Sequence, residues 1–158
     1  MKNKNDSFIK LTEDEYEAIS NWYHFAILEL IKTKDFKPNI QYIAQELGIH
    51  SEEVKDALDR LLRLGFIKVA KNKWTLISKN HIWSNPVTTS LARQKLQIEL
   101  AKKAIVSLEN IPFSLRENGS LTVAVDTRKL PEFKEKINFV LKDLSDFFQP
   151  ATTNLDSV

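Results

Sequence analysis

The chain has 158 residues, 42% of them hydrophobic, and a net charge of +2, a composition that favours packed cores over disorder. It has no cysteine, which excludes disulfides, thiolate metal sites and cysteine nucleophiles. No apolar run reaches the roughly 18 residues needed to span a bilayer, and the N-terminal residues lack the apolar centre of a signal peptide. We therefore expect a cytoplasmic protein with no membrane partner.

The first predicted helix follows residues 1–11, which we expect to be a flexible N-terminus. Thr12 suits the N-cap of a helix, and Glu15 three residues later completes the pattern of a capping box. Apolar side chains then recur every three or four residues as far as Ile31, so we predict one helix that ends near Lys34. The aromatic cluster WYHF at residues 22–25 is expected to pack in the core.

The stretch after Pro38 shows the element order of a winged helix-turn-helix. A short helix is predicted over residues 40–47, and Gly48 fits the left-handed position after its end. Ser51 is the predicted cap of a longer helix that ends at Gly65. The segments FIKV and KWTLIS then predict a hairpin with its turn at residues 70–72. We therefore predict a winged-helix subdomain over residues 12–80.

A polar link over residues 81–87 precedes a long predicted helix over residues 88–110. Three heptads can be written along this helix, with a-type positions at Leu91, Ile98 and Ile105 and d-type positions at Gln94, Ala101 and Leu108. Such a seam suits a coiled-coil dimer, but packing within one chain explains the same spacing. The sequence leaves both interpretations open.

The C-terminal part predicts one strand and one more helix. In SLTVAVD, Leu121, Val123 and Val125 alternate with smaller or polar side chains, which is typical of a half-buried strand. A lone strand leaves its backbone groups unpaired, so it must join another element or its own copy in a second chain. A final amphipathic helix is predicted from Leu130 onward. We group residues 88–150 as a dimerisation region and expect a flexible tail over residues 151–158.

Together these elements predict a mainly α protein with a small β part, in which a winged helix is followed by a long helix and a strand-helix unit. Several stretches, among them NWYHFAILELIKTKDFKPNIQYIAQELGI, EVKDALDRLLRLGFIK, ARQKLQIELAKKAI and SLTVAVD, resemble one family of bacterial proteins. It is the C-terminal domain of unknown function in predicted transcriptional regulators, found notably in predatory bacteria. The resemblance spans roughly residues 13–148 and implies a role in transcription, but no catalytic residues.

The charge distribution indicates where an acidic partner such as DNA would bind. Residues 65–110 carry eight basic and two acidic side chains, whereas every other part of the chain is near neutral or slightly acidic. The predicted recognition helix opens with acidic residues, so we expect weak or auxiliary DNA contact through the basic hairpin. The candidate DNA-binding residues are Lys55, Arg60, Arg63, Lys68, Lys71, Asn72, Lys73 and Lys79.

The alternative is a protein-interaction or dimerisation module of a regulator with no direct DNA binding, whose partner is a second copy or another regulatory protein. The candidate homodimer interface consists of Leu91, Ile98, Ala101, Ile105 and Leu108 in the long helix and Leu121, Val123 and Val125 in the strand.

No pattern typical of an enzyme is present in the sequence. We expect no catalytic residues, no metal site and no cofactor, since the three histidines are widely spaced and no glycine-rich phosphate loop occurs.

Overall fold

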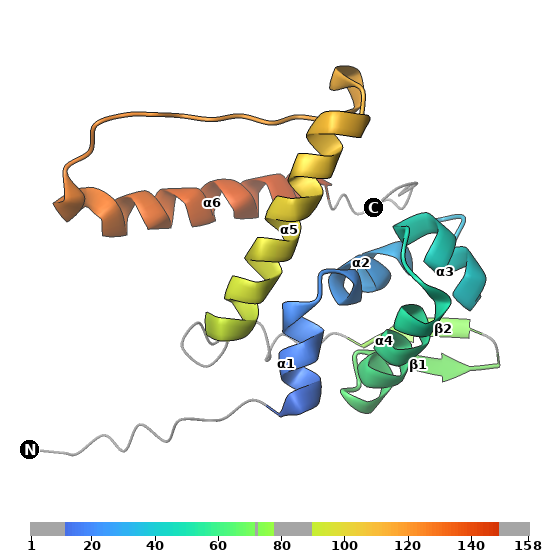
Figure 1. The fold of residues 1–158 in the computed structure, drawn as a ribbon. Coiled ribbons are helices and arrows are strands. Elements are labelled where there is room, and N and C mark those ends of the chain that lie inside the picture. The colour runs from blue at the N-terminus through green and yellow to red at the C-terminus, as the bar shows by residue number, and fades with distance from the viewer. Residues whose placement is uncertain (1–11, 72, 78–89, 149–158) are drawn as a thin grey trace, which may run out of the picture. The chain divides into compact units, whose positions relative to one another are not determined.

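The computed structural model describes residues 12–71, 73–77 and 90–148, and these fall into two compact units (Figure 1). The first unit extends to Asn110 and the second begins at Ile111. The predicted flexible ends and the link over residues 81–87 lie outside the described residues. The predicted class, mainly helical with a small antiparallel sheet, is confirmed. The helix predicted over residues 88–110 falls in the first unit, whereas the predicted dimerisation region over residues 88–150 joins it to the strand and the final helix.

Two short helices replace the single N-terminal helix predicted from the sequence. α1 spans Glu13–Ser20 and α2 spans Tyr23–Leu30. The break lies at Asn21, whose backbone is extended and whose side-chain amide donates to the backbone carbonyl (3.0 Å) and the carboxylate (2.6 Å) of Glu17. An asparagine that bonds the preceding turn in this way competes with continuation of the helix. The expected capping box of Thr12 and Glu15 is present.

α3 (Ile40–Leu47) and α4 (Ser51–Arg63) follow in the predicted order. The side chain of Asn39 caps α3 by accepting from the backbone N–H groups of its first turn, and Gly48 after its end has φ of 63°. The N-cap of α4 is His50, one residue earlier than predicted, because the Glu53 carboxylate accepts from the His50 backbone N–H at 2.9 Å. This contact satisfies an otherwise unpaired donor at the helix start.

The core of the first unit forms where α2, α3, α4 and the start of the hairpin meet. One stripe of α4, formed by Val54, Ala57, Leu58 and Leu61, is buried there, as the apolar spacing predicts. Burial of each large apolar side chain contributes about 1.5–3 kcal/mol to stability. The remaining buried members of this core are Ile27, Leu30, Ile43, Ala44, Phe66 and Ile67.

The hairpin consists of β1 (Ile67–Ala70) and β2 (Lys73–Leu76), paired antiparallel in the register Ile67 with Leu76 and Ala70 with Lys73. Its turn begins at Lys71, which has φ of 48°. Positive φ is common in the tight turns that join two paired strands. On the inner face of the hairpin, the Trp74 ring packs edge-to-face with Phe36, with ring centroids 5.8 Å apart. The predicted hairpin is thus confirmed, and its inner face is anchored to the core.

The long helix α5 (Ser90–Asn110) packs beside α1 (Figure 1). Ala92 is buried at this contact, and its small side chain permits the two helices to approach closely. Glu99 accepts from the Trp22 backbone N–H at 3.4 Å, while Lys103 Nζ lies 3.6 Å from the centroid of the Trp22 ring. Polar and cation–π contacts to the α1–α2 junction therefore supplement a small apolar contact.

The second unit contains two 3₁₀ turns (Phe113–Leu115 and Thr127–Lys129), an extended segment over residues 117–126 and the helix α6 (Leu130–Phe148). The predicted strand over residues 121–125 is drawn out beside α6 in Figure 1, but it belongs to no sheet among the described residues. None of the described residues of this unit is buried. The final helix begins at Leu130 as predicted, with its apolar side chains exposed.

His24 is a fully buried histidine that links α2 to α4. Its Nδ1 lies 3.2 Å from the Asn21 carbonyl oxygen, to which an Nδ1–H donates, and its Nε2 accepts from Arg60 Nη1 at 3.2 Å. Burial, together with the Arg60 charge, lowers the pKa of His24 from 6.5 to about 4. The imidazole is therefore neutral at pH 7.

This pKa shift predicts that the protein loses stability in mild acid. Between pH 6.5 and 4 the unfolded histidine binds a proton and the folded one does not, so the free energy of unfolding falls as pH falls through this window. The expected loss is about 1.4 kcal/mol per pH unit, and roughly 3 kcal/mol in all. Urea denaturation at a series of pH values measures it. The variant His24→Gln, which cannot titrate, should show a shallower pH dependence; equal slopes would contradict the assignment.

Candidate nucleic-acid interface

The solvent-facing side of α4 is predominantly acidic. Because the apolar stripe of α4 is buried, the positions between its members face outward. Glu52, Asp56 and Asp59 are exposed there, beside a single exposed lysine, Lys55. The macrodipole explains acidic residues in the first turn, but Asp56 and Asp59 lie beyond it. A helix that reads base edges normally presents Arg, Lys, Asn or Gln, so the exposed side of α4 is poorly suited to phosphate-rich DNA.

The structure places the two arginines of α4 in contact with α1. Arg63 makes a bidentate pair with the Asp14 carboxylate, with N–O distances of 2.8 and 2.7 Å. Arg60 Nε lies 3.3 Å from the same carboxylate, and its Nη1 reaches buried His24. Hydrogen bonding from Arg63, with the charges of both arginines, lowers the pKa of Asp14 below its usual range. Both arginines are candidate DNA contacts from the sequence; in the structure both pair with Asp14 of α1, and Arg60 also reaches His24 of α2.

Neither Asp14 nor His24 was identified from the sequence as a member of this cluster. In the sequence, Asp14 is explained by its favourable charge in the first turn of a helix, and His24 is explained as one ring of an aromatic cluster. Arginine commonly pairs with a carboxylate in this bidentate way, but sequence spacing does not reveal a pair 49 residues apart. Only packing of α1 on α4 brings these groups together.

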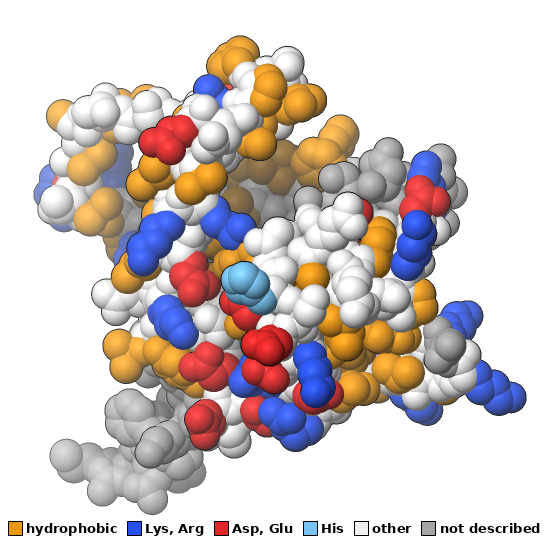
Figure 2. Space-filling model, turned by 45° about the vertical axis from the view of Figure 1, so that its right-hand side comes forward, with side chains coloured by type: hydrophobic (Ala, Val, Ile, Leu, Met, Phe, Trp, Pro, Cys, Tyr) orange, Lys and Arg blue, Asp and Glu red, His pale blue; other side chains and the backbone are white. Residues whose placement is uncertain are grey.

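The outer face of the hairpin is basic. Directly opposed residues of an antiparallel pair point to the same side, so the pairs Lys68 with Thr75 and Ala70 with Lys73 share one face. Both lysines are exposed, and Lys71 is exposed at the turn. Figure 2 shows basic side chains at the projecting end of the hairpin. No acidic residue occurs between Gly65 and Ile77, so three charges of one sign gather on a small ribbon. Candidates Asn72 and Lys79 lie outside the described residues.

An apolar groove of about 190 Å³ is lined by residues of α4 and the hairpin. The exposed fractions of two of its side chains, Leu62 at 40% and Val69 at 44%, are large for aliphatic residues in contact with a core. Asp59 and Lys55 also line it. Its remaining apolar lining is Ile40, Leu58, Ile67 and Trp74.

The predicted heptad seam of α5 lies on the side of the helix that faces away from α1. Ala92 is buried and Leu96 half-buried toward α1, whereas the seam positions are exposed. The exposed fractions are 70% for Leu91, 51% for Ile98, 57% for Ile105 and 48% for Leu108, and Ala101 is exposed as well. The other interface candidates, Leu121, Val123 and Val125, are exposed in the second unit. Dimerisation through either set remains a prediction.

Neither a membrane-spanning helix nor a metal site was found in the described part of the chain. There, no helix combines the length and the apolar character that crossing a bilayer requires. No group of three or more His, Asp or Glu side chains has the arrangement of a metal site in the same ranges.

Comparison with known proteins yields one family assignment. No curated protein and no solved structure matches the chain. One family model does match, and it covers residues 2–158, nearly the whole sequence. The chain therefore belongs to the family described as Domain of unknown function (DUF4423).

Proposed function

We propose that this domain acts in transcriptional regulation by contacting DNA phosphates through its hairpin, in the manner of the wing of a winged helix. The observation that carries the proposal is the outer face of the hairpin, where Lys68, Lys71 and Lys73 are exposed with no acidic residue nearby in the sequence. Lysine contacts to phosphate give affinity that depends on salt and not on base sequence. The resemblance to bacterial transcriptional regulators supports the same role.

The charge of α4 limits this role to an auxiliary contact. In winged-helix proteins the helix at the position of α4 enters the major groove. Here its exposed side carries Asp56 and Asp59, and its arginines are paired with Asp14. Carboxylates at a groove entrance repel phosphates, so α4 is a poor reader of sequence. The domain would add phosphate affinity to a regulator whose sequence specificity comes from elsewhere.

The alternative is a protein-interaction module that does not bind DNA. The apolar groove beside α4, together with the exposed acidic residues Asp56 and Asp59, favours a partner that is both apolar and basic.

Titration of a labelled random DNA duplex at low salt distinguishes DNA binding from protein interaction. Saturable binding supports the first, and absence of binding supports the second.

Neutralising two hairpin lysines, Lys71→Gln with Lys73→Gln, should weaken DNA binding and its salt dependence. Three phosphate contacts predict a slope of about −2.7 for log K against log salt concentration, and loss of two contacts reduces it to about −0.9. Fluorescence anisotropy on a random duplex at four or more salt concentrations measures both quantities.

A charge-matched control is Lys134→Gln with Lys142→Gln, which removes two exposed lysines of α6, outside the basic region over residues 65–110. This control should keep the wild-type slope. If both double variants change the slope equally, the hairpin is not the contact and the proposal fails.

Neutralising the acidic side of α4, Asp56→Asn with Asp59→Asn, should strengthen DNA binding about tenfold at low salt. Repulsion between one carboxylate and a phosphate about 6 Å away in water costs about 0.7 kcal/mol of binding free energy. Two carboxylates therefore account for roughly a tenfold change in affinity. The same anisotropy titration measures the change, with Glu135→Gln and Asp143→Asn on α6 as the control. Unchanged affinity would show that α4 lies away from bound DNA.

A further inference from the structure

The segment over residues 121–125 has the properties of a strand without a partner. Among the described residues its backbone N–H and C=O groups make no hydrogen bond, although unpaired backbone groups are costly when removed from water. Residues 118–125 carry no charge and no proline, the features by which proteins usually protect a free strand edge. Such an edge is suited to pair with another strand.

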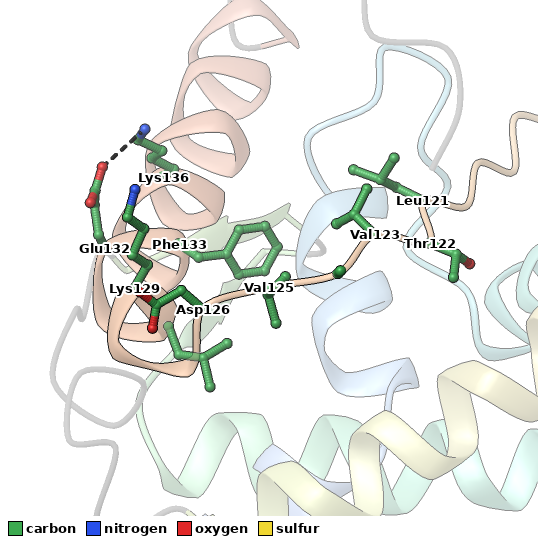
Figure 3. Close-up of a pocket in the computed structure, with 11 residues that line it drawn as sticks. Leu121, Thr122, Val123, Val125, Asp126, Lys129, Glu132, Phe133 and Lys136 are labelled. Carbon is green, nitrogen blue, oxygen red and sulfur yellow. Dashed lines mark ion pairs between the residues drawn. The ribbon is translucent and has the colours of Figure 1, made fainter.

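An apolar surface adjoins this segment. The extended segment and the first turns of α6 line an open cavity of about 780 Å³, and Figure 3 shows the Phe133 ring directed from α6 toward Val125. From Phe133 the apolar face continues along α6. Its exposed members, together with those of the segment, are Leu121, Val123, Val125, Leu130, Phe133, Ile137, Val140, Leu141, Leu144, Phe147 and Phe148.

The area of this surface matches that of one side of a stable dimer. Each of the eleven side chains is 41–80% exposed, and full burial of one such side chain removes roughly 100 Å² of apolar surface from water. Together they present on the order of 600 Å². A standard interface buries about 800 Å² per partner, somewhat more than half of it apolar.

We infer that the occupant of this surface is a second copy of the chain, joined by antiparallel pairing of the two 121–125 segments about a two-fold axis through Val123. In a two-fold interface a residue i that meets j is matched by j meeting i. Centred on Val123, Leu121 faces Val125 of the second copy, and Thr122 faces its Ala124. Apolar side chains thus meet apolar side chains on one face, and the pattern is its own complement.

The pairing would give each segment the backbone partners that it lacks. It would form a two-stranded ribbon, and the apolar face of one α6 from each copy would cover the same side. A two-stranded ribbon alone is marginal in water, so burial of the helix faces supplies most of the stabilisation. This interface does not involve the hairpin, and the inference therefore stands independently of DNA binding.

The absence of native cysteine permits a direct test of register. In the antiparallel pair the two Cα atoms of position 123 face each other at about 4.5–5.5 Å, within the range for a disulfide. Position 122 of one copy lies diagonal to position 122 of the other, at roughly 8 Å, beyond that range. Val123→Cys should therefore form a covalent dimer under mild oxidation, and the matched variant Thr122→Cys should not. Non-reducing electrophoresis measures both, beside light-scattering mass of the wild-type protein.

We expect wild-type protein at twice the 18.3 kDa of one chain and crosslinking at least tenfold faster at position 123 than at 122. A monomer at 50 μM would overturn the inference. Equal crosslinking at both positions would indicate parallel pairing and contradict the two-fold register. A dimer that is not crosslinked at position 123, and that dissociates on Ile98→Asp, would place the interface on the α5 seam instead. Circular dichroism confirms that each variant is folded.

Discussion

Burial of one stripe of α4 is the constraint on which the arrangement of the first unit depends. Once Val54, Ala57, Leu58 and Leu61 pack into the core, the 3.6-residue period determines where every other side chain of the helix lies. Asp56 and Asp59 must then face solvent. A core requirement thereby sets the charge of the surface that the domain offers to a partner.

The contacts of the two arginines follow from their position at the edge of the buried stripe. Arg60 is directed along the boundary between core and solvent, where the charge of a guanidinium needs compensation. Asp14 provides a carboxylate at 3.3 Å from Arg60, and neutral His24 accepts a further hydrogen bond. The same carboxylate binds Arg63, so one acidic residue of α1 orients the last turns of α4. These two positive charges are therefore paired within the fold, whereas the lysines of the hairpin are exposed.

The two units use apolar residues differently. In the first, the hairpin is anchored by Trp74 against Phe36 and presents its lysines on the opposite side. In the second, the described residues bury no side chain, although α6 is strongly amphipathic. Association with a matching surface would stabilise both the apolar face of α6 and the uncharged, unpaired segment beside it. These differences support the two proposals, in which the first unit contacts DNA and the second contacts a second copy.

Local signals in the sequence determined the helices α3 to α6, the hairpin, and the caps at Thr12 and Gly48, because periodicity, turn residues and capping act over a few positions. They also located the basic hairpin and the exposed heptad positions. The division of the first helix was missed, since the Asn21 contact that breaks it gives no periodic signal. Only tertiary structure decided that Arg60 and Arg63 are held by Asp14 and that His24 is buried and neutral. These properties arise from side chains that are distant along the chain and meet only when α1, α2 and α4 pack together.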